Sequence, residues 1–231
     1  MINDAFDKEK ILRYIMGFTN LVMINLLFTL TNLPILIWLG LIKNNLISVS
    51  IIIPFLLSLT IPMSLIAIFS CVMDTLTKND VYSFKNYFKK LKIGFQKDSL
   101  VIYLLWYVLL MTILLILIPS IPWLGLLIGF YFVITCMLVI MIAFAIVETL
   151  TFNNTFFQTI RNSFLSIFLN WQISVCLAVY LLFVQLLSGR IPAAPFFLFI
   201  SLYAFLFIFM YRPKLKQRII TAREKMRNTD E

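Results

Sequence analysis

Long apolar runs without Lys, Arg, Asp or Glu alternate along this chain with short polar segments. The longest run extends from Ser99 to Val147, which is enough for two membrane spans of about 20 residues each. Pro119 and Pro122 mark a turn within it, because proline does not continue a helix. The pattern predicts six transmembrane helices, at about residues 18–41, 47–73, 99–118, 124–147, 171–187 and 191–211.

The predicted fold is therefore all-α: a polytopic membrane helix bundle that forms one domain over residues 1–231. Between the spans we expect two cytoplasmic amphipathic segments, at 74–98 and 148–170, and a basic cytoplasmic tail at 212–231. Composition agrees with this class, since 62% of the residues are hydrophobic and only 13% are charged. A soluble domain carries about 25% charged residues, so this chain lacks the polar surface that a soluble protein needs.

The basic residues collect on one side of the predicted topology. Of the 19 Lys and Arg residues, all but Lys43 and Arg190 lie in the N-terminus, the two polar segments or the tail. Cationic segments stay in the cytoplasm during insertion, so both termini are predicted to be cytoplasmic. Aromatic residues typical of the membrane–water interface fall near span ends: Trp38, Trp123, Trp171 and Tyr211. Because the positive charge lies next to the membrane, it indicates anionic lipid headgroups as partners and argues against nucleic acid.

The segment at 79–98 has the pattern of a helix that lies on the membrane surface. Its apolar residues recur at spacings of three and four and fill one arc of a helix, with Tyr87 at the edge. That arc consists of Val81, Phe84, Phe88, Leu91 and Phe95. Outside it lie Lys85, Lys89, Lys90, Lys92 and Lys97. The pattern predicts contact with lipid or with a partner protein, and an ordinary linker packed on the bundle is the alternative.

A second, less charged segment repeats this design, with Arg161 as its docking cation. Its apolar residues follow the spacing of the first segment 73 residues later: Phe157, Ile160, Phe164 and Phe168. Just upstream, Asp74-Thr-Leu-Thr matches Glu148-Thr-Leu-Thr at an offset of 74. These matches indicate three repeated units, each an apolar hairpin followed by a cytoplasmic amphipathic segment. Chance similarity among apolar segments is the alternative explanation.

A few uncharged polar side chains lie within the predicted spans. They are Asn25, Thr29, Asn32, Gln172 and Gln185. The first three lie on one face of the first span, at positions i, i+4 and i+7. An amide in hydrocarbon needs a hydrogen-bonding partner, so this face should point into the bundle. Interhelical hydrogen bonds are the favoured interpretation, and the wall of a polar cavity is the alternative.

Catalytic chemistry finds little support in the sequence. Histidine is absent, which removes the commonest metal ligand and general base. The three cysteines lie in apolar runs without CxxC spacing, so neither a metal nor a cofactor is predicted. Asp74 and Glu148 stand where spans end at the cytoplasm, where they would cap the next segment or pair with Lys78 or Arg161. We therefore predict a protein that is not an enzyme, with no catalytic residue.

Two stretches carry a family resemblance. Residues 25–35 read Asn-Leu-Leu-Phe-Thr-Leu-Thr-Asn-Leu-Pro-Ile, and residues 82–95 read Tyr-Ser-Phe-Lys-Asn-Tyr-Phe-Lys-Lys-Leu-Lys-Ile-Gly-Phe. Together with Thr-Ile-Arg-Asn-Ser at 159–163, they resemble the YesL-like family of bacterial multi-span membrane proteins. The resemblance implies a place in the bacterial plasma membrane and an accessory role in carbohydrate uptake, beside a sugar ABC transporter. It implies no catalytic residue.

Three functional hypotheses follow from these features. The leading one is a membrane accessory protein that docks through residues 80–98 and the basic tail. The second is a transporter or channel for a small neutral solute, which needs a polar cavity formed by the five uncharged polar side chains named above. The third is an intramembrane enzyme acting on lipid, which needs Asp74, Glu148 and Arg161 to meet in one pocket.

Overall fold

The computed structural model describes residues 2–35, 37, 56–78, 84–116, 124–188 and 199–229. These ranges are helical apart from short turns and contain no strand, so the all-α prediction is confirmed for them. The α-helices are α1 (Ile2–Thr31), α4 (Thr60–Lys78), α5 (Phe84–Leu91), α6 (Leu100–Ile116), α7 (Leu124–Thr151), α8 (Phe156–Leu169), α9 (Trp171–Ser188) and α10 (Ile200–Thr229). Two short 3₁₀ helices, η1 (Lys92–Phe95) and η2 (Lys97–Ser99), join α5 to α6.

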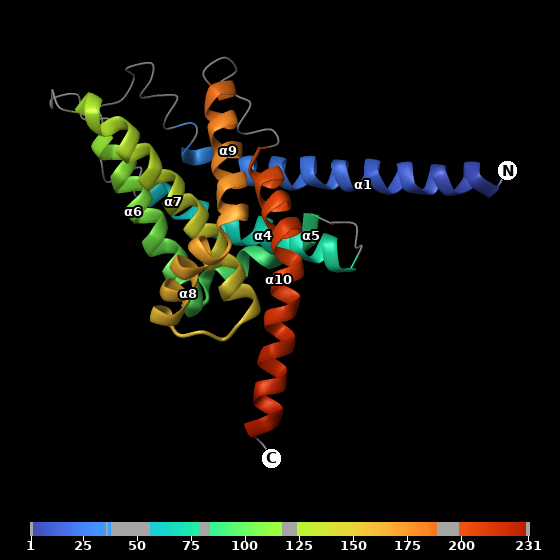
Figure 1. Ribbon diagram of the computed structural model, residues 1–231. Helices are drawn as coiled ribbons and strands as arrows, with labels where there is room; N and C mark the ends of the chain where they lie inside the picture. The colour runs from blue at the N-terminus through green and yellow to red at the C-terminus, as the bar shows by residue number, and fades with distance from the viewer. Residues whose placement is uncertain are drawn as a thin grey trace.

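One helix among these ranges is long and apolar enough to cross a membrane, namely Gly129–Thr151 within α7. The number rises to three if each of two bent helix pairs counts as one span, while Gly17–Thr31 and Thr60–Leu76 are shorter apolar helices. In Figure 1, α1 is horizontal whereas α9 and α10 are vertical. The apolar helices therefore do not all share one direction. Parts of the predicted spans, including most of residues 36–55, lie outside the described residues.

Large apolar side chains cover the outer surface of the described helices. On α7 and α9 they include Phe130, Val133, Val179, Phe183 and Leu186. Soluble proteins rarely expose contiguous apolar surface of this kind, whereas hydrocarbon around the protein makes it favourable. The surface and the apolar length of α7 together are compatible with a membrane location.

The core lies where α4, α7 and α10 meet. Phe144 of α7 packs against Phe207 of α10 with ring centroids 4.9 Å apart, and Phe69 of α4 contacts the same ring at 5.8 Å. The Phe144–Phe207 pair meets edge to face, an arrangement that adds to the stabilisation from buried apolar area. The small side chains of Ala67 and Ala204, which are fully buried, leave room for these rings.

Each amphipathic segment turns sharply into the helix that follows it. Lys85–Phe95 meets Lys97–Ile113 at 79°, and Phe156–Leu169 meets Trp171–Leu187 at 88°. The bends fall at Gln96 and Asn170, which are separated by the 74 residues of the sequence repeat. The same hydrogen bond closes both, from the Ser99 amide to the Gln96 carbonyl (3.0 Å) and from the Ile173 amide to the Asn170 carbonyl (2.9 Å). The sequence offset therefore recurs in the backbone geometry.

On α8 small polar residues face the bundle and large apolar residues face outward, the reverse of a helix in a soluble protein. Thr159, Ser163 and Ser166 are buried against the bundle, while Phe157 and Phe164 are exposed. The buried hydroxyls of Thr159 and Ser163 donate to backbone carbonyls four residues earlier, at 3.1 and 2.7 Å, so their burial leaves no donor unpaired. Small residues at a helix contact and large apolar residues outside are typical of helices surrounded by lipid.

Candidate functional site

Two side-chain amides, Asn25 within α1 and Asn32 directly after it, make hydrogen bonds to other helices. Asn32 is almost fully buried; its amide donates to the Ser64 hydroxyl of α4 (2.8 Å), and its oxygen accepts from Thr60 (2.9 Å). The oxygen of Asn25 accepts from the backbone amide of Ser201 in α10 at 3.1 Å. Thr29 donates to the Asn25 carbonyl within α1. Asn25 and Asn32 thus make hydrogen bonds between helices, as the sequence favoured, whereas the bond of Thr29 stays within α1.

The structure does not bring the five polar span residues into one cavity. Gln172 and Gln185 are exposed on α9, away from the buried Asn25 and Asn32. A cavity of about 340 Å³ does lie among α1, α4, α6, α7, α9 and α10, but its lining is almost entirely apolar. Only Asn32 of the five lines it, and that amide is already hydrogen-bonded. The cavity thus offers a polar solute few groups to bind.

Replacing Asn32 by Leu should destabilise the bundle, because Ser64 and Thr60 would lose their partner. Interhelical hydrogen bonds in membranes contribute about 0.6 kcal/mol on average and up to about 1.7 kcal/mol. We expect a loss in this range, measured as the midpoint of thermal unfolding in detergent. Gln185→Leu is the matched control, since the same change at an exposed position removes no contact of the described side chains; an equal loss in both variants would contradict the structural role of Asn32.

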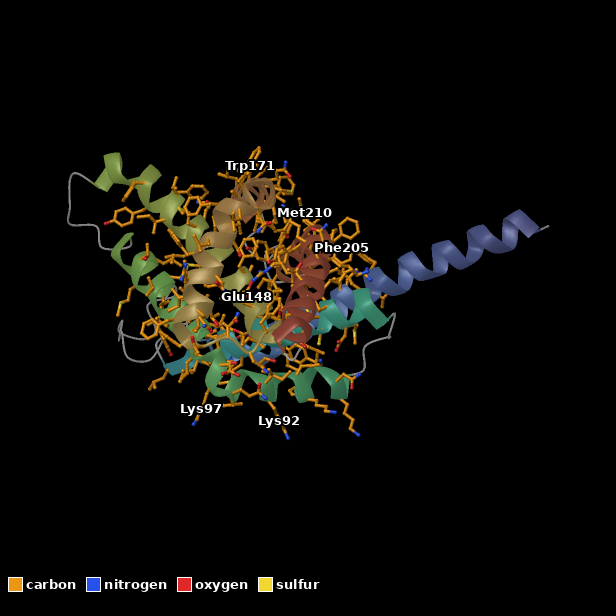
Figure 2. The ribbon with its side chains drawn as sticks, turned by 60° about the horizontal axis from the view of Figure 1, so that its bottom comes forward. Lys92, Lys97, Glu148, Trp171, Phe205 and Met210 are labelled. Carbon is orange, nitrogen blue, oxygen red and sulfur yellow. The ribbon has the colours of Figure 1, made fainter. Side chains whose placement is uncertain are left out.

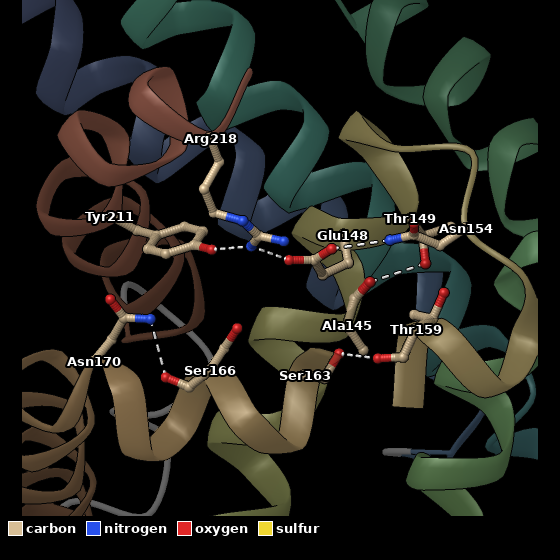
Figure 3. Close-up of polar contacts among 10 residues, drawn as sticks. All are labelled: Ala145, Glu148, Thr149, Asn154, Thr159, Ser163, Ser166, Asn170, Tyr211 and Arg218. Atoms are coloured by element: carbon tan, nitrogen blue, oxygen red, sulfur yellow. Dashed lines mark hydrogen bonds and ion pairs between the residues drawn. The ribbon is translucent and has the colours of Figure 1, made fainter. Parts of the chain in front are cut away.

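A buried ion pair joins α7 to α10. Glu148 is only 1% exposed, and its Oε1 accepts a hydrogen bond from Nη1 of Arg218. Oε2 accepts from the Asn154 amide at 3.0 Å, and the same Arg218 nitrogen donates to the Tyr211 hydroxyl at 2.7 Å. The guanidinium also lies 5.0 Å from the centre of the Phe152 ring. Figure 3 shows this line of contacts from Tyr211 through Arg218 and Glu148 to Asn154.

The electrostatics of the pair are consistent with this geometry. Burial by itself lowers the pKa of the Arg218 guanidinium, but the hydrogen bond to Glu148 and the nearby Tyr211 outweigh it and raise the pKa above its usual value. Arg218 therefore stays charged and neutralises the buried carboxylate. Asp74, the residue that matches Glu148 at the offset of 74, pairs with Lys90 of α5 at 2.7 Å, and its carboxylate is more exposed than that of Glu148.

The structure shows one cation beside each carboxylate, and neither of them is Arg161, one of the two partners that the sequence suggested. Arg161 is exposed on α8 and pairs with neither Asp74 nor Glu148 among the described side chains, and the side chain of Lys78 lies outside them. Sequence reasoning missed Arg218 because it ended the last span at 211, whereas α10 continues through Pro213 to Thr229. Tyr211 and Arg218 lie seven residues apart, on one face of a continuous helix, and that spacing was the available signal.

A pocket of about 740 Å³, with one polar and one apolar wall, lies beside the ion pair. Its walls come from the segment between α7 and α8, from α8 and from α10. Lys214 and Arg218 supply charge, and Asn162 and Gln217 supply amides. Among the described residues, no carboxylate lines it.

The lysines after α4 are presented on a segment that is held firmly to the bundle. Tyr87 lies on the inner face of α5 and is buried there, and this burial raises the pKa of its hydroxyl well above the usual value. The ion pair with Asp74 fixes Lys90, and Ser99 donates to the Ile93 carbonyl at 3.0 Å. Gly94 approaches Met63 so closely that a Cβ atom there would lie 2.9 Å from the Met63 Cα.

The exposed side of this segment carries the cations and two aromatic rings. Phe95 is 73% exposed and Phe88 40%, and both belong to the predicted apolar arc, whereas Tyr87 at the edge of that arc is the buried residue. The side chain of Phe84 lies outside the described ones. The exposed lysines, which we call the lysine surface, are Lys85, Lys89, Lys92 and Lys97. Figure 2 shows Lys92 and Lys97 pointing away from the bundle, while Glu148 lies inside it.

Comparison of the chain with protein-family models, with curated proteins and with solved structures finds no match. The fold and the sites define its class by themselves. The described part of the chain is all-α, has an apolar outer surface and includes at least one helix long and apolar enough to cross a membrane.

Proposed function

We propose that this chain is a multi-pass protein of the bacterial plasma membrane, with six spans in three repeated hairpins and both termini in the cytoplasm. The two sharp bends support this arrangement, because a helix at 79° or 88° to a span lies close to the plane of the membrane. The apolar residues exposed on α8 and the distribution of Lys and Arg support it independently.

Cysteine labelling tests this topology directly. Of the native thiols, Cys71 and Cys136 are buried and Cys176 is exposed, so Cys176 is first replaced by Ala. Lys43→Cys and Arg190→Cys are then expected to react with a membrane-impermeant maleimide added outside the cell, and Lys89→Cys only after the membrane is opened. Reaction of the Lys43 and Arg190 positions only from the cytoplasmic side would reject the orientation.

Within this topology, the protein acts as a non-enzymatic accessory component that associates with a carbohydrate transport system of the ABC type. One observation carries this proposal: the lysine surface is rigidly mounted and points outward. A fixed array of cations beside exposed Phe88 and Phe95 suits an acidic, partly apolar surface on a partner or the anionic membrane beside it. The resemblance to YesL-like proteins supplies the class of partner.

Neutralising the lysine surface should weaken the association. In the double variant Lys89→Gln/Lys92→Gln we expect at least a severalfold loss of a co-purifying sugar transporter from mild detergent at native expression, because each lysine near an anionic surface contributes about 1 kcal/mol. Lys43→Gln makes the same change in the opposite loop and should leave co-purification unchanged. Failure of the unaltered protein to co-purify, together with unchanged sugar uptake in a deletion strain, would overturn the proposal.

A further inference from the structure

The pocket beside the buried ion pair combines features that the sequence-predicted sites do not use. It is bounded by α8 on one side and by α10 on the other, and it lies next to the end of the membrane-spanning helix α7. Figure 3 shows Ser166 of α8 and Asn170, the residue after α8, below Tyr211 and Arg218 of α10. In the topology proposed above, on which this inference rests, the pocket stands at the level of the lipid headgroups.

The polar wall of this pocket has the chemistry of an anion site. Glu148 is buried behind Arg218 and does not line the pocket, so the carboxylate is shielded from a bound anion. The Arg218 side chain is 40% exposed, and Lys214 has no carboxylate partner among the described side chains. Asn162 and Gln217 add side-chain amides that can donate further hydrogen bonds. Charge-assisted hydrogen bonds from such groups suit the oxygens of a phosphate.

The apolar wall indicates where that phosphate comes from. Leu165 and Leu169 line the pocket and are exposed at the same time, by 42% and 76%. They continue into the exposed apolar side chains of Phe168 and Trp171 on the outer surface. A soluble phosphate has no apolar part that could contact this rim, whereas the acyl chains of a phospholipid would lie along it.

We propose that this pocket binds the headgroup of an anionic phospholipid, with Lys214 and Arg218 contacting the phosphate and with the acyl chains lying along α8. The site is separate from the lysine surface and does not depend on a role in sugar uptake. A lipid held between α8 and α10 would also tie the end of α10 to the bilayer, because its contacts come from both helices.

The test uses the full chain in mild detergent and counts bound lipids by native mass spectrometry. Phosphatidylglycerol is expected to be retained in preference to phosphatidylcholine. Lys214→Gln should weaken its binding about fivefold, the loss that one lysine near an anionic headgroup would cause. Lys214→Arg should restore binding. Lys216→Gln removes an exposed lysine that does not line the pocket and serves as the matched control.

Three other results would contradict the proposal. Equal retention of the two lipids, or an equal loss in the Lys214→Gln and Lys216→Gln variants, would show that no specific headgroup site exists. Competition by millimolar inorganic phosphate as strong as that by short-chain phosphatidylglycerol would assign the pocket to a soluble anion. The midpoint of thermal unfolding of the Lys214→Gln variant should match that of the unaltered protein. A large drop would mean that Lys214 stabilises the fold and that the loss of lipid follows from unfolding.

Discussion

Replacing Arg218 by Met is expected to lower the free energy of unfolding by about 3–5 kcal/mol, the cost of removing one partner of a buried ion pair. Glu148 is 1% exposed, so its carboxylate would stay inside the protein without its cation. The Arg218 side chain is 40% exposed and water can partly replace it, so we expect a value at the lower end of that range. Thermal unfolding in detergent would measure the effect as a lowered midpoint.

Two further variants separate the ion pair from general effects of substitution. Glu148→Gln combined with Arg218→Met removes both charges and should recover much of the lost stability, because no buried charge then stays unpaired. Arg161→Met changes an exposed arginine without a carboxylate partner among the described side chains, so its effect should stay within about 0.5 kcal/mol. A single Arg218→Met variant as stable as Arg161→Met would show that the pair does not hold α7 to α10.

The substitution Gly94→Ala is expected to cost about 1–3 kcal/mol, the usual penalty for overpacking. The added Cβ would lie 2.9 Å from the Met63 Cα, closer than carbon atoms approach in proteins, and the obstacle is backbone that cannot rotate away. The segment from α5 to η1 must therefore move off α4. Limited trypsin digestion should reveal this movement as faster cleavage at Lys89 and Lys92.

Gly129→Ala is the control, because it is expected to change stability in the opposite direction. It lies within α7, and a Cβ atom added there would have no neighbour within 4 Å, so Gly129→Ala should stabilise by up to about 1 kcal/mol through helix propensity. If Gly94→Ala leaves both the thermal midpoint and the cleavage rate unchanged, the close packing of α5 on α4 is not real. If it changes them, co-purification of a transporter should fall as well, because the lysine surface would lose its fixed position.

The repeat that the sequence indicates stays a prediction, and two features of the described backbone share its offset. Asp74 and Glu148 are matched at an offset of 74, and the bends at Gln96 and Asn170 have the same offset. Local sequence determines such features, since a turn and its hydrogen bond involve only neighbouring residues. The ion pairs of the two carboxylates are not repeated, because Lys90 lies 16 residues after Asp74 while Arg218 lies 70 residues after Glu148.

By itself the sequence determined that the described chain is helical and that its polar segments carry the cations. Apolar segments in lipid must satisfy their own backbone hydrogen bonds, and a helix does this without reference to the rest of the fold. Apart from the face of Asn25 and Asn32, which the sequence already placed toward the bundle, only the tertiary structure decided which face of each helix is buried. In a segment that is apolar on every side, the core-facing and lipid-facing residues look alike, so periodicity does not distinguish them. The inward position of Tyr87, the outward positions of Gln172 and Gln185 and the choice of Arg218 for Glu148 all depend on how distant helices pack.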